Sequence, residues 1–460
     1  MDADSDAVRH VFGVALHHLR TEAGLSLRAL AVQARYDHTR LSRAEHGEHL
    51  PAADWVKDID TALHAGGLLT LLRSLAPASL STPKGPTALP LADLRVDDGP
   101  SDSVTLQMHT PDGRTVQVKL SRRQLGELMA GGLLHTMLPA GVTDPDQADR
   151  VAKVIAEEHP VDPEVLSYFD RLLTEHFTAD KMIGPRQLLG TTLAQVRVLD
   201  QLRRTASPDT TEPLLRLLAQ YGEFAGWLQQ DLGDTTAARH WSDRASGWAQ
   251  AAGDYTMVAY LMIRKSNIAL LDNDAREVIE LAAGARKVPG ATNPRLHALA
   301  AQQQARGWAL YGDATRFQQH IEGAATLLGH HPADHDPNAP VYLHQYNLDV
   351  LQEQSAGGYR DCGQAATAVR ILENKITATG EHLRRDQGHL LAKLANTVLA
   401  TKDPEPDRAV ALGIRSAMAA QLTGSARITK ELHTLNNLLA ARFPTTPGRR
   451  ELHDAVVALG

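Results

Sequence analysis

Residues 24–47 read GLSLRALAVQARYDHTRLSRAEHG, and this stretch decides the fold of the N-terminal part of the chain. Ser26 supplies an N-cap hydroxyl, and apolar residues follow it at helical spacing, which predicts a first short helix. Asp37 predicts the cap of a second helix. Gly47 is expected to end that helix, because glycine takes a left-handed C-terminal conformation without a Cβ penalty.

Two helices joined by a turn of three to four residues form a helix-turn-helix, whose second helix enters the major groove of DNA. The residues that define the pattern here are Ala31, Leu41, Ser42, Arg43, Glu45 and Gly47. With a small residue in the first helix, then an apolar residue with Ser-Arg and Glu-x-Gly, the stretch resembles the phage-repressor-type (XRE) motif. It departs from that family at the turn, where Arg35 replaces the usual Gly; a left-handed arginine costs about 1 kcal/mol.

The outward face of the second helix supplies the side chains that can read DNA. Arginine can pair with guanine through two hydrogen bonds, while serine and threonine reach bases or phosphates. The predicted DNA-binding residues are Arg28, Arg35, Asp37, His38, Thr39, Arg40, Ser42 and Arg43. The alternative is an ordinary amphipathic helix pair without a role in nucleic-acid binding.

Composition bounds the class of protein. A chain of 460 residues is too long for one core, and 43% hydrophobic with 4% aromatic residues favours helices packed through small side chains. The single cysteine, Cys362, excludes internal disulfides and is expected in the core. The sequence shows no signal peptide and no apolar run of membrane-spanning length, so a soluble, cytoplasmic protein without membrane contact is expected.

Net charge argues against a general affinity for nucleic acid. The chain carries a formal charge of −7, and residues 1–75 hold eight Arg and Lys against ten Asp and Glu. Positive charge is local to the two short helices, where four arginines, Arg28, Arg35, Arg40 and Arg43, are balanced only by Asp37. An acidic body repels DNA from every other face, so each headpiece is expected to bind modestly and to need dimerisation.

The rest of the headpiece reads as three further helices, over 7–23, from Pro51 through Leu63, and over 68–75. After it, alternation at Val104–Met108 and Val116–Leu120 predicts a β-hairpin around a bulged turn. A lone hairpin is marginally stable, so it must dock on the helical body or pair with a second subunit. The predicted domains are 1–76 (helix-turn-helix), 77–102 (Pro-rich linker), 103–160 (hairpin and connecting helices) and 161–460 (helical repeats).

From about residue 212 the sequence becomes periodic. Turns at Gly233-Asp234, Asn273-Asp274 and Gly312-Asp313 recur at intervals of 39–40 residues, and further turns are predicted near Gly357-Gly358 and Asp403-Pro404. A helix pair repeating at this period is the signature of an α-solenoid, with alanines such as Ala245, Ala282 and Ala314 at the close-packing positions of each second helix. These units resemble tetratricopeptide repeats. The run around Gly226-Trp227 and Trp241 is similar to the sensor half of large bacterial regulators with a repressor-type headpiece.

Other candidate sites in the repeats carry less chemistry. His330, His331 and His335 lie in a Pro/Asn/Asp-rich loop without the helical spacing that orients zinc ligands, so no metal site is predicted. The candidate ligand-binding residues are Trp227, Trp308, Arg384 and Arg385; Asp386 could equally pair with a neighbouring arginine. The sequence lacks a phosphate-cradling Gly-rich loop and a nucleophile elbow, so neither a cofactor nor an enzymatic activity is expected.

The sequence therefore predicts a mainly α-helical protein: a five-helix repressor-type domain, a small β-hairpin in the linker region and a tetratricopeptide-like α-solenoid. The resemblance implies a homodimeric transcriptional regulator that binds a double-stranded DNA operator and senses a small molecule or peptide through its repeats. The alternative is a tetratricopeptide-type protein-interaction scaffold that binds DNA only incidentally.

Overall fold

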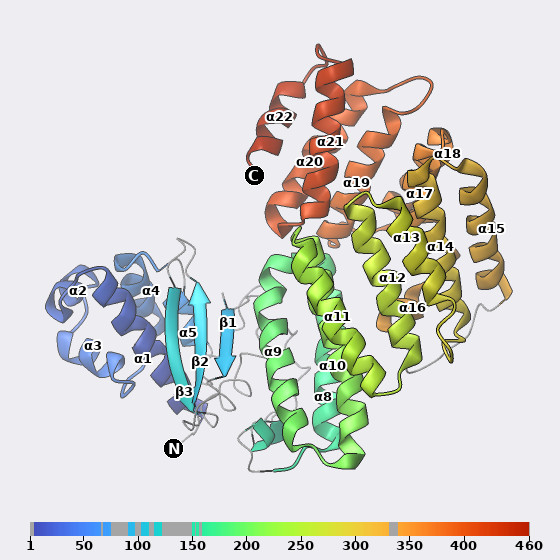
Figure 1. Ribbon diagram of the computed structural model, residues 1–460. Helices are drawn as coiled ribbons and strands as arrows, with labels where there is room; N and C mark the ends of the chain where they lie inside the picture. The colour runs from blue at the N-terminus through green and yellow to red at the C-terminus, as the bar shows by residue number, and fades with distance from the viewer. Residues whose placement is uncertain are drawn as a thin grey trace. The chain divides into compact units, whose positions relative to one another are not determined.

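The computed structural model describes residues 4–65, 68–74, 91–96, 103–109, 115–121, 150–151, 153–155, 159–330 and 339–459. Within these ranges the protein is mainly α-helical and has one small antiparallel sheet (Figure 1). This confirms the predicted fold class. Two compact units divide the chain, namely Met1–His176 with Gln187–Leu214, and Phe177–Arg186 with Leu215–Gly460.

Five helices form the N-terminal domain: α1 (Asp4–Glu22), α2 (Leu27–Gln33), α3 (His38–Glu45), α4 (Ala53–Ala62) and α5 (Leu68–Ser74). The predicted caps are present. Ser26 Oγ accepts from the Ala29 amide at 3.1 Å, and Asp37 Oδ1 accepts from the Arg40 amide at 2.9 Å. Gly47 has φ +72°, as expected of a residue that ends a helix. The buried face of α1 carries Val8, Val11, Phe12, Ala15, Leu16 and Leu19.

The fourth helix differs from the prediction in two details. It begins at Ala53 rather than at Pro51, and Trp55, which helical spacing groups with the apolar residues Val56, Ile59 and Leu63, is 39% exposed. Trp55 instead packs on Tyr36, with ring centroids 5.1 Å apart. An amphipathic aromatic ring can cover a neighbour and still meet water, which helical periodicity alone does not distinguish from full burial.

The small sheet contains β1 (Leu91–Val96), β2 (Ser103–His109) and β3 (Thr115–Ser121) in that order. The predicted hairpin is β2–β3, whose register pairs Leu106 with Val118. Strand β1 adds a third, antiparallel strand from a segment that the sequence analysis placed in the linker. On β3, Val116 and Val118 are buried, and the strand packs against α1. The hairpin thus docks on the helices of the N-terminal domain.

Two predicted features lie outside the described residues. They are the helix expected after Ser121 and most of the histidine-rich loop, including His331 and His335. His330 is described and is the last residue of α15 (Ala314–His330), where its Nδ1 lies 2.7 Å from the Thr326 carbonyl oxygen. Within the described part of the chain, no three His, Cys, Asp or Glu side chains gather as metal ligands.

A buried histidine, His176, lies in the first long helix that the structure describes after the small sheet. His176 belongs to α8 (Pro163–Ile183), which Gly184 at φ +79° separates from α9 (Pro185–Thr205). The side chain has no exposed surface, and its Nε2 lies 2.9 Å from Gln195 Oε1. Burial disfavours the imidazolium and lowers the pKa of His176 to about 4.

This histidine should make stability depend on pH. The folded-state pKa lies below the unfolded value of 6.5, so the unfolded chain binds the proton first and stability is lost as pH falls from about 6.5 to 4. The expected loss is up to about 3 kcal/mol, from 1.36 kcal/mol per pKa unit. Urea unfolding across this pH window checks it. His176→Gln should flatten the slope, whereas His159→Gln, at an exposed position, should leave it unchanged.

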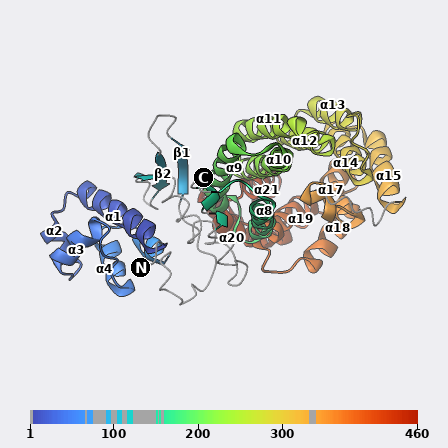
Figure 2. The same cartoon turned by 90° about the horizontal axis from the view of Figure 1, so that it is seen from below.

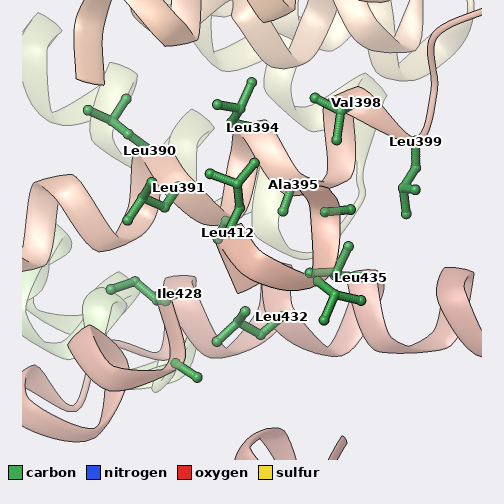
Figure 3. Close-up of a cluster of buried hydrophobic side chains, with 14 of the residues drawn as sticks. Leu390, Leu391, Leu394, Ala395, Val398, Leu399, Leu412, Ile428, Leu432 and Leu435 are labelled. Atoms are coloured by element: carbon green, nitrogen blue, oxygen red, sulfur yellow. The ribbon is translucent and has the colours of Figure 1, made fainter. Parts of the chain in front are cut away.

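The remaining helices pair as repeats. They are α10 (Pro208–Asp231), α11 (Thr235–Ala251), α12 (Tyr255–Leu271), α13 (Ala275–Ala285), α14 (Pro294–Tyr311), α15 (Ala314–His330), α16 (Val341–Gln345), α17 (Leu348–Asp361), α18 (Ala365–Ala378), α19 (Arg384–Val398), α20 (Pro406–Thr423), α21 (Ala426–Arg442) and α22 (Arg449–Val457). From α11 to α15 and from α17 to α22, consecutive helices pack on one another. The cluster of α19, α20 and α21 shows this packing through buried alanine and leucine (Figure 3).

Local capping explains where the repeats turn. Asp234, Asp254 and Asp274 each accept a hydrogen bond from the amide three residues on, at 2.8–2.9 Å. The residue before each aspartate has positive φ, and at Asn273 it reaches +59° without glycine. A left-handed residue followed by an N-cap reverses the chain in two residues. The three predicted turns at 233–234, 273–274 and 312–313 are confirmed, as is the one near Asp403-Pro404.

Three other predictions for the repeats were wrong. Gly357-Gly358 lies inside α17, which ends at Asp361. Gly358 does not mark a turn; it allows α15 and α17 to pack closely, because a Cβ at this position would overlap the Phe317 ring. The chain turns instead at Gly363, where φ is +77°. Cys362 is the partly exposed C-cap of α17 rather than a core residue. Ala314 is exposed, because Phe317 fills the core position of that turn.

The repeats curve so that the last pairs return to the first. In Figure 2, α10, α12 and α14 lie on the inner side and α11, α13 and α15 on the outer side. Ser425 Oγ donates to Asp231 Oδ1 at 2.5 Å, and Lys430 Nζ donates to the Leu271 carbonyl at 2.7 Å. These contacts join α21 to the ends of α10 and α12. The inner helices consequently face one another around a shared centre.

Candidate functional site

Helix α3 presents one polar face and anchors the other. Leu41 and Ala44 have no exposed surface, whereas His38, Thr39, Arg40 and Arg43 are exposed. Ser42 is partly exposed, and Arg28 and Arg35 are exposed before and within the turn. The predicted DNA-binding side chains are therefore all at least partly exposed on α2, the turn and α3.

Asp37 is exposed but its carboxylate is occupied. Because it accepts from the Arg40 amide, it fixes the first turn of α3 and thereby the direction in which the arginines project. Arg35, at the turn, has φ +50°. The left-handed arginine considered from the sequence is therefore present, and its exposed side chain extends from the start of the turn.

An ion pair that the sequence analysis did not identify holds α3 against α1. Glu45, whose side chain is 4% exposed, accepts from Arg20 Nη2 at 3.0 Å and from Arg20 Nε, and it lies 3.0 Å from His17 Nδ1. Arg20 also donates to the Leu25 carbonyl at 2.8 Å, which ties the loop before α2 to the same group. A buried carboxylate such as Glu45 requires a cation partner, but the Glu-x-Gly motif alone does not show that Glu45 is buried.

Gly13 on α1 sets how closely α3 approaches. A Cβ at this position would lie 2.6 Å from the carbonyl oxygens of Ala44 and Glu45. The small residue that allows α1 and α3 to approach closely is therefore Gly13 on α1, which lies outside the motif at residues 24–47. Ala31, the small residue of the motif's first helix, is also buried.

Gly13→Ala is expected to displace the end of α3 and to destabilise the N-terminal domain by about 1–3 kcal/mol, the usual cost of overpacking. Hydrogen–deuterium exchange of α1 and α3 in the full chain measures this as faster exchange. Gly247→Ala is the matched control, since a methyl group on that helical glycine would meet no atom within 4 Å. Unchanged exchange in Gly13→Ala would show that the contact has room for the methyl group.

The electrostatic environment of this surface is positive. Among the described residues, Arg28, Arg35 and Arg40 form no ion pair, while Arg43 Nε lies 3.4 Å from Glu48 Oε2 in an exposed pair. Burial lowers the pKa of His49, and Arg43, Arg40 and Arg73 lower it further. Guanidinium groups without carboxylate partners are available to phosphate oxygens.

One apolar side chain is also exposed on this domain: Val32 on α2 is 78% exposed, which the sequence pattern did not indicate.

A second polar centre lies on the inner face of the repeats. Trp227 on α10 donates its indole N–H to Asp180 Oδ2 at 2.8 Å. Three guanidinium carbons lie over its ring, those of Arg427 at 4.4 Å, Arg264 at 4.8 Å and Arg385 at 5.4 Å from the centroid. Cation–π contacts of this kind are strongest where water is excluded.

Arg385 is a buried structural cation. Its side chain is 6% exposed and ion-paired with Asp180, with Asp231 at 3.6 Å and with Asp386 at 2.7 Å. The pairing of Asp386 with a neighbouring arginine, left open from the sequence, is thus present. Burial raises the pKa of the Asp180 carboxyl, and the Arg385 cation opposes that rise.

The four candidate ligand-binding residues do not form one site. Arg384 is exposed and Arg385 buried, so adjacent positions face different environments. Trp308 contacts Arg316, 4.2 Å from its ring centroid, and Tyr311, whereas Trp227 contacts the inner arginines. Of the four, Trp227 and Arg385 belong to the inner polar centre.

No described helix is long and apolar enough to cross a lipid bilayer. Residues 11–72 match a family model described as a helix-turn-helix domain. The search of curated proteins found no match. Among solved structures, the chain is similar to a signal transduction ATPase with numerous domains that carries a tetratricopeptide repeat sensor, from Pyrococcus horikoshii, at 12% identity and a TM-score of 0.37. The match covers 74% of this chain and 52% of that one, so the chain spans about half its length. The family match and the geometry of α2 and α3 together identify residues 11–72 as a helix-turn-helix domain.

Proposed function

We propose that the protein is a sequence-specific transcriptional regulator that docks α3 into the major groove of an operator and responds to an effector through its repeats. The observation that carries the DNA-binding part is the outer face of α3, where exposed Arg40 and Arg43 project from a helix fixed by a capped start and a buried ion pair. Arginine on a rigid helix gives both phosphate attraction and base readout.

Homodimerisation is part of this proposal. The chain has a formal charge of −7, so a single headpiece meets DNA against the repulsion of the rest of the protein. Two headpieces on two half-sites overcome that repulsion by binding together. We propose a cytoplasmic, non-enzymatic protein without a cofactor.

The effector role rests on the inner polar centre of the repeats. Helices α8, α10, α12, α19 and α21 all contribute side chains to it, so a molecule bound there contacts several repeats at once. A ligand shifts a conformational equilibrium only by its difference in affinity for the two states. Bridging several repeats provides that difference, because the contacts depend on the curvature of the domain.

The other candidate function is a protein-interaction scaffold. Met418 and Leu422, 61% and 59% exposed, stand four residues apart on α20 and leave an apolar strip on its surface. The two functions separate in one experiment, the affinity of the full chain for duplex DNA as a function of salt. Phosphate contacts by α3 give a log–log slope of about −0.9 for each contact. A scaffold without DNA binding gives no measurable complex even at low salt.

A further inference from the structure

Arg306, on α14, is a cation without a carboxylate ion-pair partner among the described residues. Its Nη1 donates to Asn267 Oδ1 at 3.1 Å and to Gln303 Oε1 at 3.4 Å, which are both neutral acceptors. Among the described residues it forms no ion pair. Burial lowers the pKa of Arg306 to about 10. The Arg306 side chain is only partly exposed; a guanidinium that is partly desolvated without a counter-charge is unfavourable, and such groups concentrate at functional sites.

Cations on two other helices interact electrostatically with this part of the inner side, because Arg306 and Arg427 both lower the pKa of Lys393. On α19, Arg385, His389 and Lys393 are spaced four residues apart, which places them along one face of the helix. On α21, Arg427 pairs with Asp231 at 2.8 Å. Arg385 is already neutralised by three carboxylates, whereas Lys393 Nζ has Glu353 Oε1 at 3.6 Å.

His389 lies at the centre of this group. Its partly exposed imidazole makes no hydrogen bond within the described chain. Its pKa is lowered well below the usual value, first by burial and then by Lys393, Arg427, Arg385 and Arg306. The carboxylates Glu353, Glu431 and Asp361 and the Tyr342 phenol act on the neighbouring Lys393 and Arg306. The charged groups that lower the pKa of His389 are all cations, and the imidazole retains unused hydrogen-bonding capacity.

We propose that this inner face binds a small oxyanion-bearing molecule, a phosphate or carboxylate compound, held by Arg306, His389 and Lys393. Arg306 supplies the fork of donors, Lys393 a compact charge, and His389 a donor once the anion is present. Trp227, beneath Arg385 and Arg427, forms the adjoining wall. The inference rests on the proposed effector role and names the chemical class of that effector.

The test uses the full chain labelled with 5-fluorotryptophan, which gives five fluorine resonances for the five tryptophans. Trp227→Phe assigns the resonance nearest the site. Titration with inorganic phosphate and, separately, with succinate should shift that resonance in a saturable way, beyond matched chloride. Tighter phosphate binding assigns a phosphate compound, tighter succinate binding a carboxylic acid, and equal binding an oxyanion site for either.

Variants show whether the effect belongs to this site. Arg306→Gln keeps donors for Asn267 and removes the charge, so it should weaken binding at least tenfold, while Arg306→Lys should retain most of it. Arg276→Gln, on the outer helix α13 with its side chain 86% exposed, should bind as the parent does. The absence of a saturable shift, or an equal shift in Arg306→Gln, would overturn the inference.

Operator binding is measured on the same samples, so the two failures are distinguishable. DNA binding without a phosphate or succinate shift removes the anion site and leaves the regulator. An anion shift without DNA binding leaves the site and removes the proposed function. If both occur but operator affinity is the same with and without the anion, the site stands and its role as the effector site is rejected.

Discussion

Replacement of Arg385 by leucine is expected to destabilise the repeat domain by about 3–5 kcal/mol, because it leaves a buried carboxylate without its cation. Asp180 and Asp231, 4% and 0% exposed, both lie against Arg385. Asp231 retains Arg427 and Ser425, but Asp180 retains only the Trp227 indole among the partners described above. The destabilisation therefore comes mainly from the buried Asp180 carboxylate, which loses its cation.

The loss of stability in Arg385→Leu should depend on pH. Without Arg385, the folded-state pKa of Asp180 rises further above its unfolded value, so the carboxyl is stable when protonated and stability is lost as pH rises through that pKa. Urea unfolding followed by tryptophan fluorescence measures the effect, since Trp227, Trp241 and Trp248 lie in this domain. Arg384→Leu removes an exposed charge one residue away and should change stability little. Equal stability of the two variants would refute a structural role for Arg385.

Arg40→Ala and Arg43→Ala are each expected to weaken operator binding by about 1–3 kcal/mol, the range for loss of an arginine that reads a base. Both side chains are exposed on α3 and the helix is fixed by its buried face, so helix content should not change. Fluorescence anisotropy with a selected operator gives the affinity. Circular dichroism checks the fold.

The control for charge is Arg276→Ala, which removes one cation from an exposed site on α13. It should leave operator affinity unchanged, because the interaction between DNA and a distant exposed charge is screened. Parent-like affinity of both α3 variants would rule out the docking of α3 proposed above.

Features set by neighbouring residues could be predicted from the sequence. The caps at Ser26 and Asp37 and the left-handed Gly47 act within one helical turn of their own positions, so their residue types are sufficient to place α2 and α3. The aspartates that start the repeat helices follow the same logic, which is why the turns near 233, 273 and 312 were placed correctly.

Features that depend on distant partners could not be predicted. Gly358 suggests a turn until Phe317, 41 residues earlier, is seen against it. Arg385 resembles a free ligand-binding cation until it is seen with Asp180, 205 residues away. Strand β1 forms by pairing with β2. The sequence around β1 is rich in proline and therefore does not indicate a strand. In the N-terminal domain, Gly13 and Arg20 contact the end of α3 and lie outside the residues that carry the motif.

The central claim is that α3 reads DNA, and selection from a random duplex library tests it most directly. Full-length protein and the Arg40→Ala/Arg43→Ala double variant are compared at low salt. We expect the parent to enrich a pseudo-palindromic motif with half-sites about one helical turn apart, and the double variant to enrich none. Failure of the parent to enrich any motif, or the same motif from both proteins, would contradict the claim.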